Sequence, residues 1–158
     1  GLGIRMASSS TGSGGEFLAK KSVLIRARES LPKLTDVLIV EDETFDAERL
    51  TATLRVMFGY ELGVRRAATL ASALDRLIEK QPQIVFLDDV LKPSDDAGQS
   101  IPYIRRAGYQ GPIVVVSGQV TRTRRATLMS AGATDVIHKD DVDSVRLAEA
   151  MVRVFKPV

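Results

Sequence analysis

The chain has 158 residues, of which 44% are hydrophobic and 27% are charged, so it is long enough for one globular domain with its own core and too short for two. It contains no cysteine, which excludes disulfides and thiol chemistry and is consistent with a cytoplasmic protein. No apolar run approaches the roughly 18 to 20 residues that span a bilayer, and no signal-peptide pattern is present, so we expect no membrane association.

The positive charge lies near the N-terminus. The net charge is +2, but residues 18–33 contain five basic residues and one acidic residue, and we therefore expect no direct binding of the domain to nucleic acid. Residues 1–17 are rich in glycine and serine and look like a vector-derived linker. Residues 18–33 form a basic lead-in with the spacing of a short amphipathic helix that ends at Pro32, and residues 34–158 form the domain.

The rest of the chain alternates between strand and helix patterns. Runs of consecutive apolar residues are typical of parallel strands buried on both faces, and apolar residues at a 3.6-residue period are typical of helices packed on one side. The alternation predicts an α/β fold with a doubly wound parallel sheet. The predicted strands are residues 36–40, 63–68, 84–88, 113–116 and 135–139, and the predicted helices are residues 44–58, 69–81, 101–107, 121–131 and 141–156.

Polar side chains follow four of these strands. Because the carboxyl ends of parallel strands lie at one edge of a sheet, we expect these side chains to converge in one crevice. Carboxylates and water form the all-oxygen site that Mg²⁺ prefers. A carboxylate can also attack a phosphoryl group, and a lysine and a hydroxyl can hold the phosphoryl oxygens. The side chains are Glu41 and Asp42, then Asp88 and Asp89, then Ser117, and finally Lys139.

Four motifs occur in order, each at the end of a predicted strand. They are Val-Leu-Ile-Val-Glu-Asp-Glu from Val37, Ile-Val-Phe-Leu-Asp from Ile84, Val-Val-Val-Ser-Gly from Val114 and Ile-His-Lys from Ile137. Together, over about residues 35–155, they resemble the receiver domain of two-component response regulators. The resemblance implies a flavodoxin-like (βα)5 fold. It also implies that a sensor histidine kinase or a histidine phosphotransfer protein transfers a phosphoryl group to an aspartate of this chain.

The resemblance further implies a role for each residue of the crevice. The acceptor aspartate would bind Mg²⁺ together with Glu41, Asp42 and the backbone carbonyl of Val90. Ser117 would follow the phosphoryl group, and Lys139 would bind it. The phosphorylated domain would then change its interactions with other proteins, although the sequence identifies neither the kinase nor the output partner.

Two adjacent aspartates compete for the role of acceptor. Counting forward from Pro82 through the apolar strand selects Asp88, whereas counting back from Pro93, which in many receiver domains lies four residues after the acceptor, selects Asp89. A loop tolerates an inserted residue, but shifting a strand by one residue turns every side chain to the opposite face. We therefore favour Asp88 as acceptor and metal ligand and keep Asp89 as the second choice.

Three features depart from the family pattern. Val136 occupies a position that is commonly aromatic, Asp140 replaces the proline that usually follows the lysine, and the turn at residues 93–98 is one residue longer than usual. These departures leave a phosphorylation-independent scaffold as an alternative function. A phosphatase of the HAD type is another alternative, but it needs a second aspartate two residues after the first, where this chain has Val90.

The last predicted helix has more apolar surface than one sheet face covers. Its apolar residues span about twice the roughly 100° arc of a helix packed on one side, and a large exposed apolar patch usually marks an interface. We expect a homodimer whose interface includes Leu147, Met151 and Val154, because one self-complementary patch suffices for a twofold interface. The lead-in around Leu24 and Leu31 is the alternative cover.

Two further groups of polar residues have an open assignment. Arg122, Arg124 and Arg125 begin the helix at residues 121–131, and they are expected to form either a solvated face or part of a partner-binding surface. His138 is the only histidine. It has no partners for a metal site, so we expect a structural or solvent-facing role.

Overall fold

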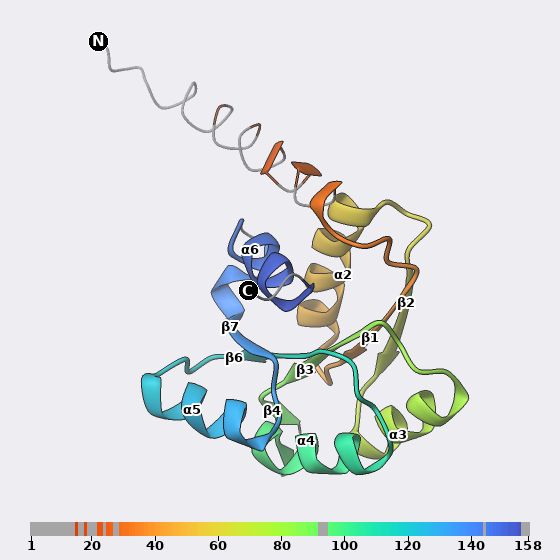
Figure 1. Ribbon diagram of the computed structural model, residues 1–158, viewed down its shortest axis with the longest axis vertical. Helices are drawn as coiled ribbons and strands as arrows, with labels where there is room; N and C mark the ends of the chain where they lie inside the picture. Colours follow the sequence, from red (N-terminus) through yellow and green to blue (C-terminus); the bar gives the residue numbers. More distant parts are fainter. Residues whose placement is uncertain are drawn as a thin grey trace.

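The computed structural model describes residues 30–91, 95–143 and 145–155, together with Gly15, Leu18, Ser22, Val23, Ile25, Arg26 and Glu29. Apart from Gly15, the segment interpreted as a linker lies outside these residues, so that interpretation stays a prediction. The described residues of the lead-in up to residue 30 are helical and lie on the N-terminal side of the domain (Figure 1). Leu31, which follows them, is buried. Among the described residues, no helix has both the length and the apolar character that crossing a membrane requires.

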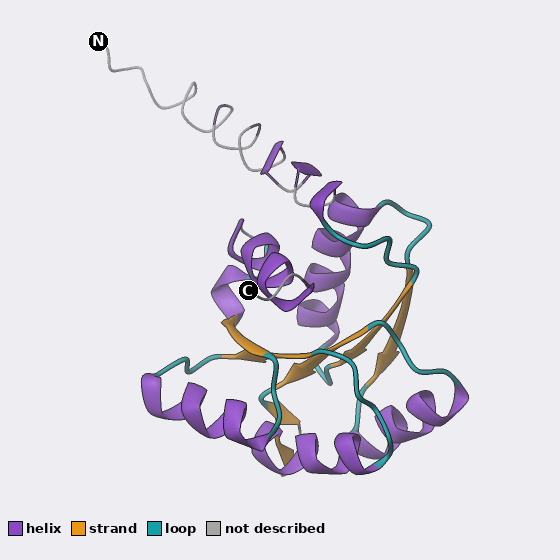
Figure 2. Cartoon of the chain, viewed as in Figure 1, coloured by secondary structure: helices purple, strands orange, loops and turns teal. Residues whose placement is uncertain are grey.

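Five parallel strands form the central sheet, in the order β2-β1-β3-β6-β7 (Figure 2). Every residue of β1, β3 and β6 is buried, as expected for strands covered on both faces. The strand order reverses between β1 and β3, so the crevice of this sheet opens at their carboxyl ends. The strands are β1 (Asp36–Val40), β2 (Gly63–Ala67), β3 (Ile84–Asp88), β6 (Ile113–Ser117) and β7 (Asp135–His138).

Helices cover both faces of the sheet, and each face has its own core. The helices α2 and α6 lie on one face, and α3, α4 and α5 lie on the other (Figure 1). Phe86 packs in the first core and Leu87 in the second, because successive side chains of a strand point to opposite faces. The helices are α2 (Thr44–Phe58), α3 (Leu70–Glu79), α4 (Ala97–Arg106), α5 (Arg122–Ala131) and α6 (Val145–Phe155).

Side-chain caps begin the three helices of the second face. The side chains of Thr69, Asp96 and Thr121 each accept a hydrogen bond from a backbone N–H in the first turn of α3, α4 and α5. The cap at Asp96 starts α4 at Ala97, earlier than the predicted residue 101, because an aspartate oxygen satisfies an N–H group that would otherwise lack a partner.

The segment after β3 also differs from the expected turn. Two short strands, β4 (Val90–Leu91) and β5 (Asp95–Asp96), pair there in antiparallel orientation. Residues 92–94 lie outside the described residues, so the predicted one-residue extension of this turn stays a prediction. A 3₁₀ turn, η1 (Lys139–Asp141), follows β7, and α6 therefore starts at Val145 rather than at the predicted residue 141.

The apolar face of the helix α6 is buried within the domain. Leu147 and Met151 have no exposed surface and Val154 is 9% exposed, because all three pack in the core that the sheet shares with α2. The lead-in also lies close by, since Val23 and Val152 line one surface pocket. The prediction that Leu147, Met151 and Val154 form a dimer interface is therefore wrong for this fold, whereas self-association itself stays a prediction.

Candidate functional site

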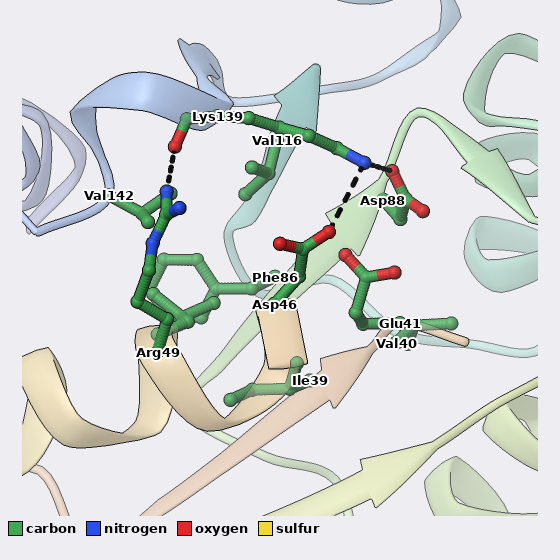
Figure 3. Close-up of a pocket in the computed structure, with 11 residues that line it drawn as sticks. Ile39, Val40, Glu41, Asp46, Arg49, Phe86, Asp88, Val116, Lys139 and Val142 are labelled. Carbon is green, nitrogen blue, oxygen red and sulfur yellow. Dashed lines mark hydrogen bonds and ion pairs between the residues drawn. The ribbon is translucent and has the colours of Figure 1, made fainter. Parts of the chain in front are cut away.

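A pocket opens at the carboxyl ends of β1, β3 and β7, on the face covered by α2 (Figure 3). Its polar lining consists of Glu41 after β1, Asp88 at the end of β3, Lys139 after β7, and Asp46 and Arg49 from α2. Apolar side chains such as Phe86 and Val116 form its inner wall. A pocket therefore lies at the sheet edge where the crevice was predicted, and Glu41, Asp88 and Lys139 of the predicted residues line it.

Three carboxylates meet at this pocket. Oxygen atoms of Glu41, Asp42 and Asp88 lie within 4.8 Å of one another, so the three side chains could hold one metal ion. Burial raises the pKa of Glu41 to about 8, and the neighbouring Asp88 carboxylate adds to the rise. A divalent cation would relieve this crowding of negative charge, and three oxygen donors with room for water suit Mg²⁺. The residues present therefore fit the expected ion.

Lys139 supplies the positive charge of the pocket. Its Nζ lies 3.2 Å from Asp88 Oδ1 and 3.8 Å from Asp46 Oδ2. Burial alone would lower the pKa of Lys139, but the charges of Asp88 and Glu41 outweigh it, so the pKa is raised above its ordinary value. Arg49 donates a hydrogen bond to the backbone carbonyl of Lys139, which ties α2 to the segment that carries the lysine.

Asp89 belongs to a second cluster on the opposite face of the sheet. Its Oδ2 accepts hydrogen bonds from Ser117 Oγ at 2.6 Å and from Arg124 Nε at 3.1 Å, and its Oδ1 pairs with Arg124 Nη2. Burial alone would raise the pKa of Asp89, but the hydrogen bonds from Arg124 and Ser117 lower it below the ordinary value. A bidentate arginine pair of this kind is among the strongest polar contacts in proteins.

The sheet explains why neighbouring aspartates have different partners. Asp88 lies beside Val116 in the β3–β6 register, and the backbone N–H of Asp89 continues that pairing by donating to the Val116 carbonyl at 2.9 Å. Ser117 lies one residue further along β6. Because side chains alternate between faces, Asp88 points to the α2 side with Lys139, whereas Asp89 and Ser117 point to the α5 side.

The predicted site residues are thus divided between two places. Glu41, Asp88 and Lys139 line the pocket, and the Asp42 carboxylate is grouped with those of Glu41 and Asp88. Ser117 is held by Asp89 outside the lining of that pocket. The backbone N–H of Val90 donates to Asp88 Oδ1 at 3.4 Å, and the metal-binding role of its carbonyl stays a prediction.

Sequence reasoning missed Asp46 and Arg49. Both lie in the first two turns of α2, and the available signal was that this helix starts directly after the acids that follow β1. A helix that starts at the crevice directs its first polar side chains toward it, so residues 46 and 49 could have been included as candidates.

The arginines of α5 do not form a simple solvated face. Arg124 pairs with Asp89, and Arg125 pairs with the buried Asp135 of β7 at 2.8 Å, as does Arg153 of α6 at 2.9 Å. Arg122 is exposed. The first turn of α5 is therefore connected by ion pairs to the segment after β3 and to β7. The chain beside these contacts has Val136 in β7, so no aromatic side chain occupies that position.

His138 has a local structural contact, in agreement with its expected role. Its Nδ1 accepts a hydrogen bond from the backbone N–H of Asp140 at 3.0 Å. This contact belongs to the 3₁₀ turn η1 and helps to set the path of the chain after Lys139.

Comparisons with known proteins agree with this architecture. A family model described as the response regulator receiver domain matches residues 37–151, while no curated protein matches the chain. The chain is similar to the receiver domain of the putative response regulator NarL from Mycobacterium tuberculosis, with 17% identity, 80% of this chain and 100% of that chain covered, and a TM-score of 0.66. It is also similar to a putative response regulator from Chloroflexus aurantiacus, with 25% identity, 77% and 100% of the two chains covered, and a TM-score of 0.60.

A two-component response regulator from Clostridium difficile has the same fold, with 17% identity, 77% and 94% of the two chains covered, and a TM-score of 0.65. Structural likeness at such identities supports the flavodoxin-like fold. The family match goes further, because it extends from β1 into α6 and contains the ends of all the strands that line the pocket. Receiver domains are signalling domains rather than enzymes in the usual sense. The chain belongs to the family of response regulator receiver domains.

Proposed function

We propose that this receiver domain accepts a phosphoryl group on Asp88 from a sensor histidine kinase or a histidine phosphotransfer protein, in a reaction that requires Mg²⁺. Phosphorylation then switches an interaction with another protein in the cytoplasm. The observation that carries the proposal is the position of Asp88. Its carboxylate is grouped with those of Glu41 and Asp42 and also lies 3.2 Å from the Lys139 ammonium.

The chemistry needs a nucleophile and a positively charged surrounding. An Asp88 oxygen forms the new O–P bond while the P–N bond of the phosphohistidine breaks, and the imidazole leaves with the electron pair. The Lys139 ammonium binds phosphoryl oxygens and stabilises the charge that they carry in the transition state. Bound by Glu41, Asp42 and Asp88, Mg²⁺ would supply further neutralisation of the phosphoryl oxygens.

The geometry favours Asp88 over Asp89 for this role. Asp89 already accepts hydrogen bonds from Ser117 and a bidentate contact from Arg124, so both its oxygens are engaged. It also has no contact with Lys139 among the ion pairs of the described residues. A nucleophile must be free to approach phosphorus, and only Asp88 of the two lies in the pocket with the other acids.

Intact-mass measurement with acetyl phosphate and Mg²⁺ tests the assignment. The parent protein should gain one phosphoryl group, Asp88→Asn should gain none, and Asp89→Asn should still be labelled. The opposite result for the two variants would assign the acceptor to Asp89. The control is the parent protein with excess EDTA, in which labelling should cease.

A phosphorylation-independent scaffold is the second candidate. The observation that favours it is Val136, which leaves β7 without the aromatic side chain common in the family. This candidate predicts that the parent protein remains unlabelled under all conditions while it still binds its protein partner. The labelling experiment therefore decides between the two.

A further inference from the structure

Asp89, Ser117 and Arg124 form one connected unit between the acceptor segment and α5. Asp89 is 6% exposed and Ser117 is 1% exposed, so their hydrogen bond at 2.6 Å is shielded from water. Arg124 is in the first turn of α5, where its backbone N–H also donates to the capping hydroxyl of Thr121 at 3.0 Å. One carboxylate therefore fixes a serine at the end of β6 and the first turn of a helix.

We propose that Asp89 and Arg124 are positioning residues that hold Ser117 away from the phosphoryl site and hold the first turn of α5, and that phosphoryl uptake at Asp88 loosens both contacts. The proposal rests on the proposed function, since it requires a phosphoryl group on Asp88. It adds a role for a second aspartate and for an arginine that the reaction itself does not use.

The Ser117 hydroxyl has a single proton for its acceptors. A serine hydroxyl can donate only one hydrogen bond at a time, and in the unphosphorylated domain its nearest acceptor is Asp89 at 2.6 Å, ahead of the Gln119 carbonyl at 3.0 Å. A phosphoryl group on Asp88 places a more highly charged acceptor on the neighbouring residue. Asp89 is the weaker competitor, because its charge is already neutralised by Arg124. Ser117 therefore exchanges Asp89 for the phosphoryl oxygens.

The loss of the Ser117 contact also affects α5, through Asp89. The Oδ2 atom of Asp89 serves both Ser117 and Arg124 Nε, so the serine helps to orient the carboxylate for its bidentate contact. Without Ser117 the carboxylate can rotate, and the geometry that strengthens the arginine pair is lost. The first turn of α5 then retains its other ion pair, between Arg125 and Asp135, and moves relative to the acceptor segment.

This route fits a chain that has Val136 in β7. Allosteric coupling requires an element with two arrangements whose balance both sites affect. An arginine on α5 and a carboxylate next to the acceptor provide such an element by electrostatic contact, without a large side chain that changes rotamer.

Hydrogen–deuterium exchange of the backbone amides of α5 tests the proposal, with beryllofluoride and Mg²⁺ as the probe that mimics the phosphoryl group. In the parent protein, exchange at the start of α5 should become several-fold faster when the probe is bound. In Arg124→Gln, exchange should already be several-fold faster without the probe, and the probe should add little. Arg124→Lys, which keeps one charged contact with Asp89, should lie between these two.

Arg122→Gln is the matched control, because Arg122 lies in the same turn but is exposed. It should behave like the parent protein with and without the probe. Circular dichroism establishes that each variant is folded, and ¹⁹F NMR of bound beryllofluoride establishes that the probe is present. Asp89→Ala should bind the probe more tightly than the parent protein, because Ser117 then loses its nearest competing acceptor and keeps only the Gln119 carbonyl at 3.0 Å.

The outcomes separate this inference from the proposed function. If beryllofluoride binds to the parent protein and exchange in α5 stays the same, the coupling is refuted and the phosphoryl acceptor role remains. Equal exchange in Arg124→Gln and the parent protein without the probe also refutes it. If the parent protein neither binds beryllofluoride nor accepts a phosphoryl group, the proposed function fails, and the release step fails with it.

Discussion

Asp88 and Asp89 are consecutive residues in opposite electrostatic situations. The Asp88 pocket contains three grouped carboxylates, and burial, with the neighbouring Asp88 carboxylate as a smaller cause, raises the pKa of Glu41. The Asp89 cluster contains one carboxylate that is paired with one arginine and accepts a hydrogen bond from one hydroxyl. The pKa of the Asp89 carboxyl is lowered. A group of carboxylates can gain stability from a bound cation, whereas a carboxylate that is already paired with an arginine is suited to a structural role.

Met151→Glu should disrupt both regions at once and have the largest effect. Met151 has no exposed surface, so the substitution places a carboxylate in the core behind the Asp88 pocket. A buried unpaired charge costs about 4 kcal/mol or more, and we expect the domain to unfold or to become marginally stable. Urea denaturation measures the loss. If Met151→Glu folds with parental stability and only changes the mass in light scattering, the helix does belong to a dimer interface.

Asp42→Asn should affect only the Asp88 pocket, because it removes a ligand of the cation site and leaves the Asp89 cluster intact. Because Asp42 contributes one of three grouped carboxylates, we expect the affinity for Mg²⁺ to fall about 10- to 100-fold or more. Asp89→Asn should bind Mg²⁺ as the parent protein does, since Asp89 is not among the grouped ligands. Isothermal titration of the metal-free proteins measures both. Equal affinity in Asp42→Asn and the parent protein would contradict the metal assignment.

Glu41→Gln should change the pH dependence of stability in the Asp88 pocket and not in the Asp89 cluster. The pKa of Glu41 is raised from 4.5 to about 8 in the folded protein, so the folded form retains a proton that the unfolded chain releases. The associated stability is fully present below about pH 4.5 and is lost as the pH rises through about 8. In EDTA, the glutamine variant should therefore gain on the order of 2 kcal/mol relative to the parent protein between pH 5 and pH 9.

Urea denaturation at both ends of this pH range provides the measurement for Glu41→Gln. Asp75→Asn, at an exposed position on α3 of the opposite face, is a control that should not change the pH profile. If the free energy of unfolding varies with pH in the same way in Glu41→Gln and the parent protein, the titration of Glu41 does not contribute to the stability of the fold.

Asp89→Asn should show the opposite sign and the smallest effect. The pKa of Asp89 lies below its ordinary value of 3.8 because of Arg124 and Ser117, so its stabilising contribution is present above that value and is lost as the pH falls through the lowered one. Asparagine keeps an acceptor for Ser117 but loses the charge, and we expect a cost of about 1 kcal/mol at neutral pH. If the difference between Asp89→Asn and the parent protein does not diminish at any pH below 3.8 at which both remain folded, the effect is one of packing.

Much of the fold followed from local patterns. Strands such as Ile113–Ser117 are continuous apolar runs, and α2 occupies the predicted residues 44–58, because a run of that kind and a 3.6-residue period each permit few alternatives. The start of α4 could not be predicted from these patterns, because it depends on which of several aspartates caps the helix. The start of α6 also did not follow, because the 3₁₀ turn after Lys139 competes with a regular helix in a segment rich in acids.

The site shows the same division. The order of residues along the chain is enough to predict that acids, a hydroxyl and a lysine follow successive strands, and parallel topology brings such ends to one edge. The packing of the folded chain is needed to see that Ser117 and Asp89 lie on the α5 side and that Arg124 completes their contact. It also decided that Met151 is covered by its own domain. Those outcomes depend on contacts between residues far apart in the chain, and no local pattern encodes which distant partner will neutralise a charge or cover an apolar face.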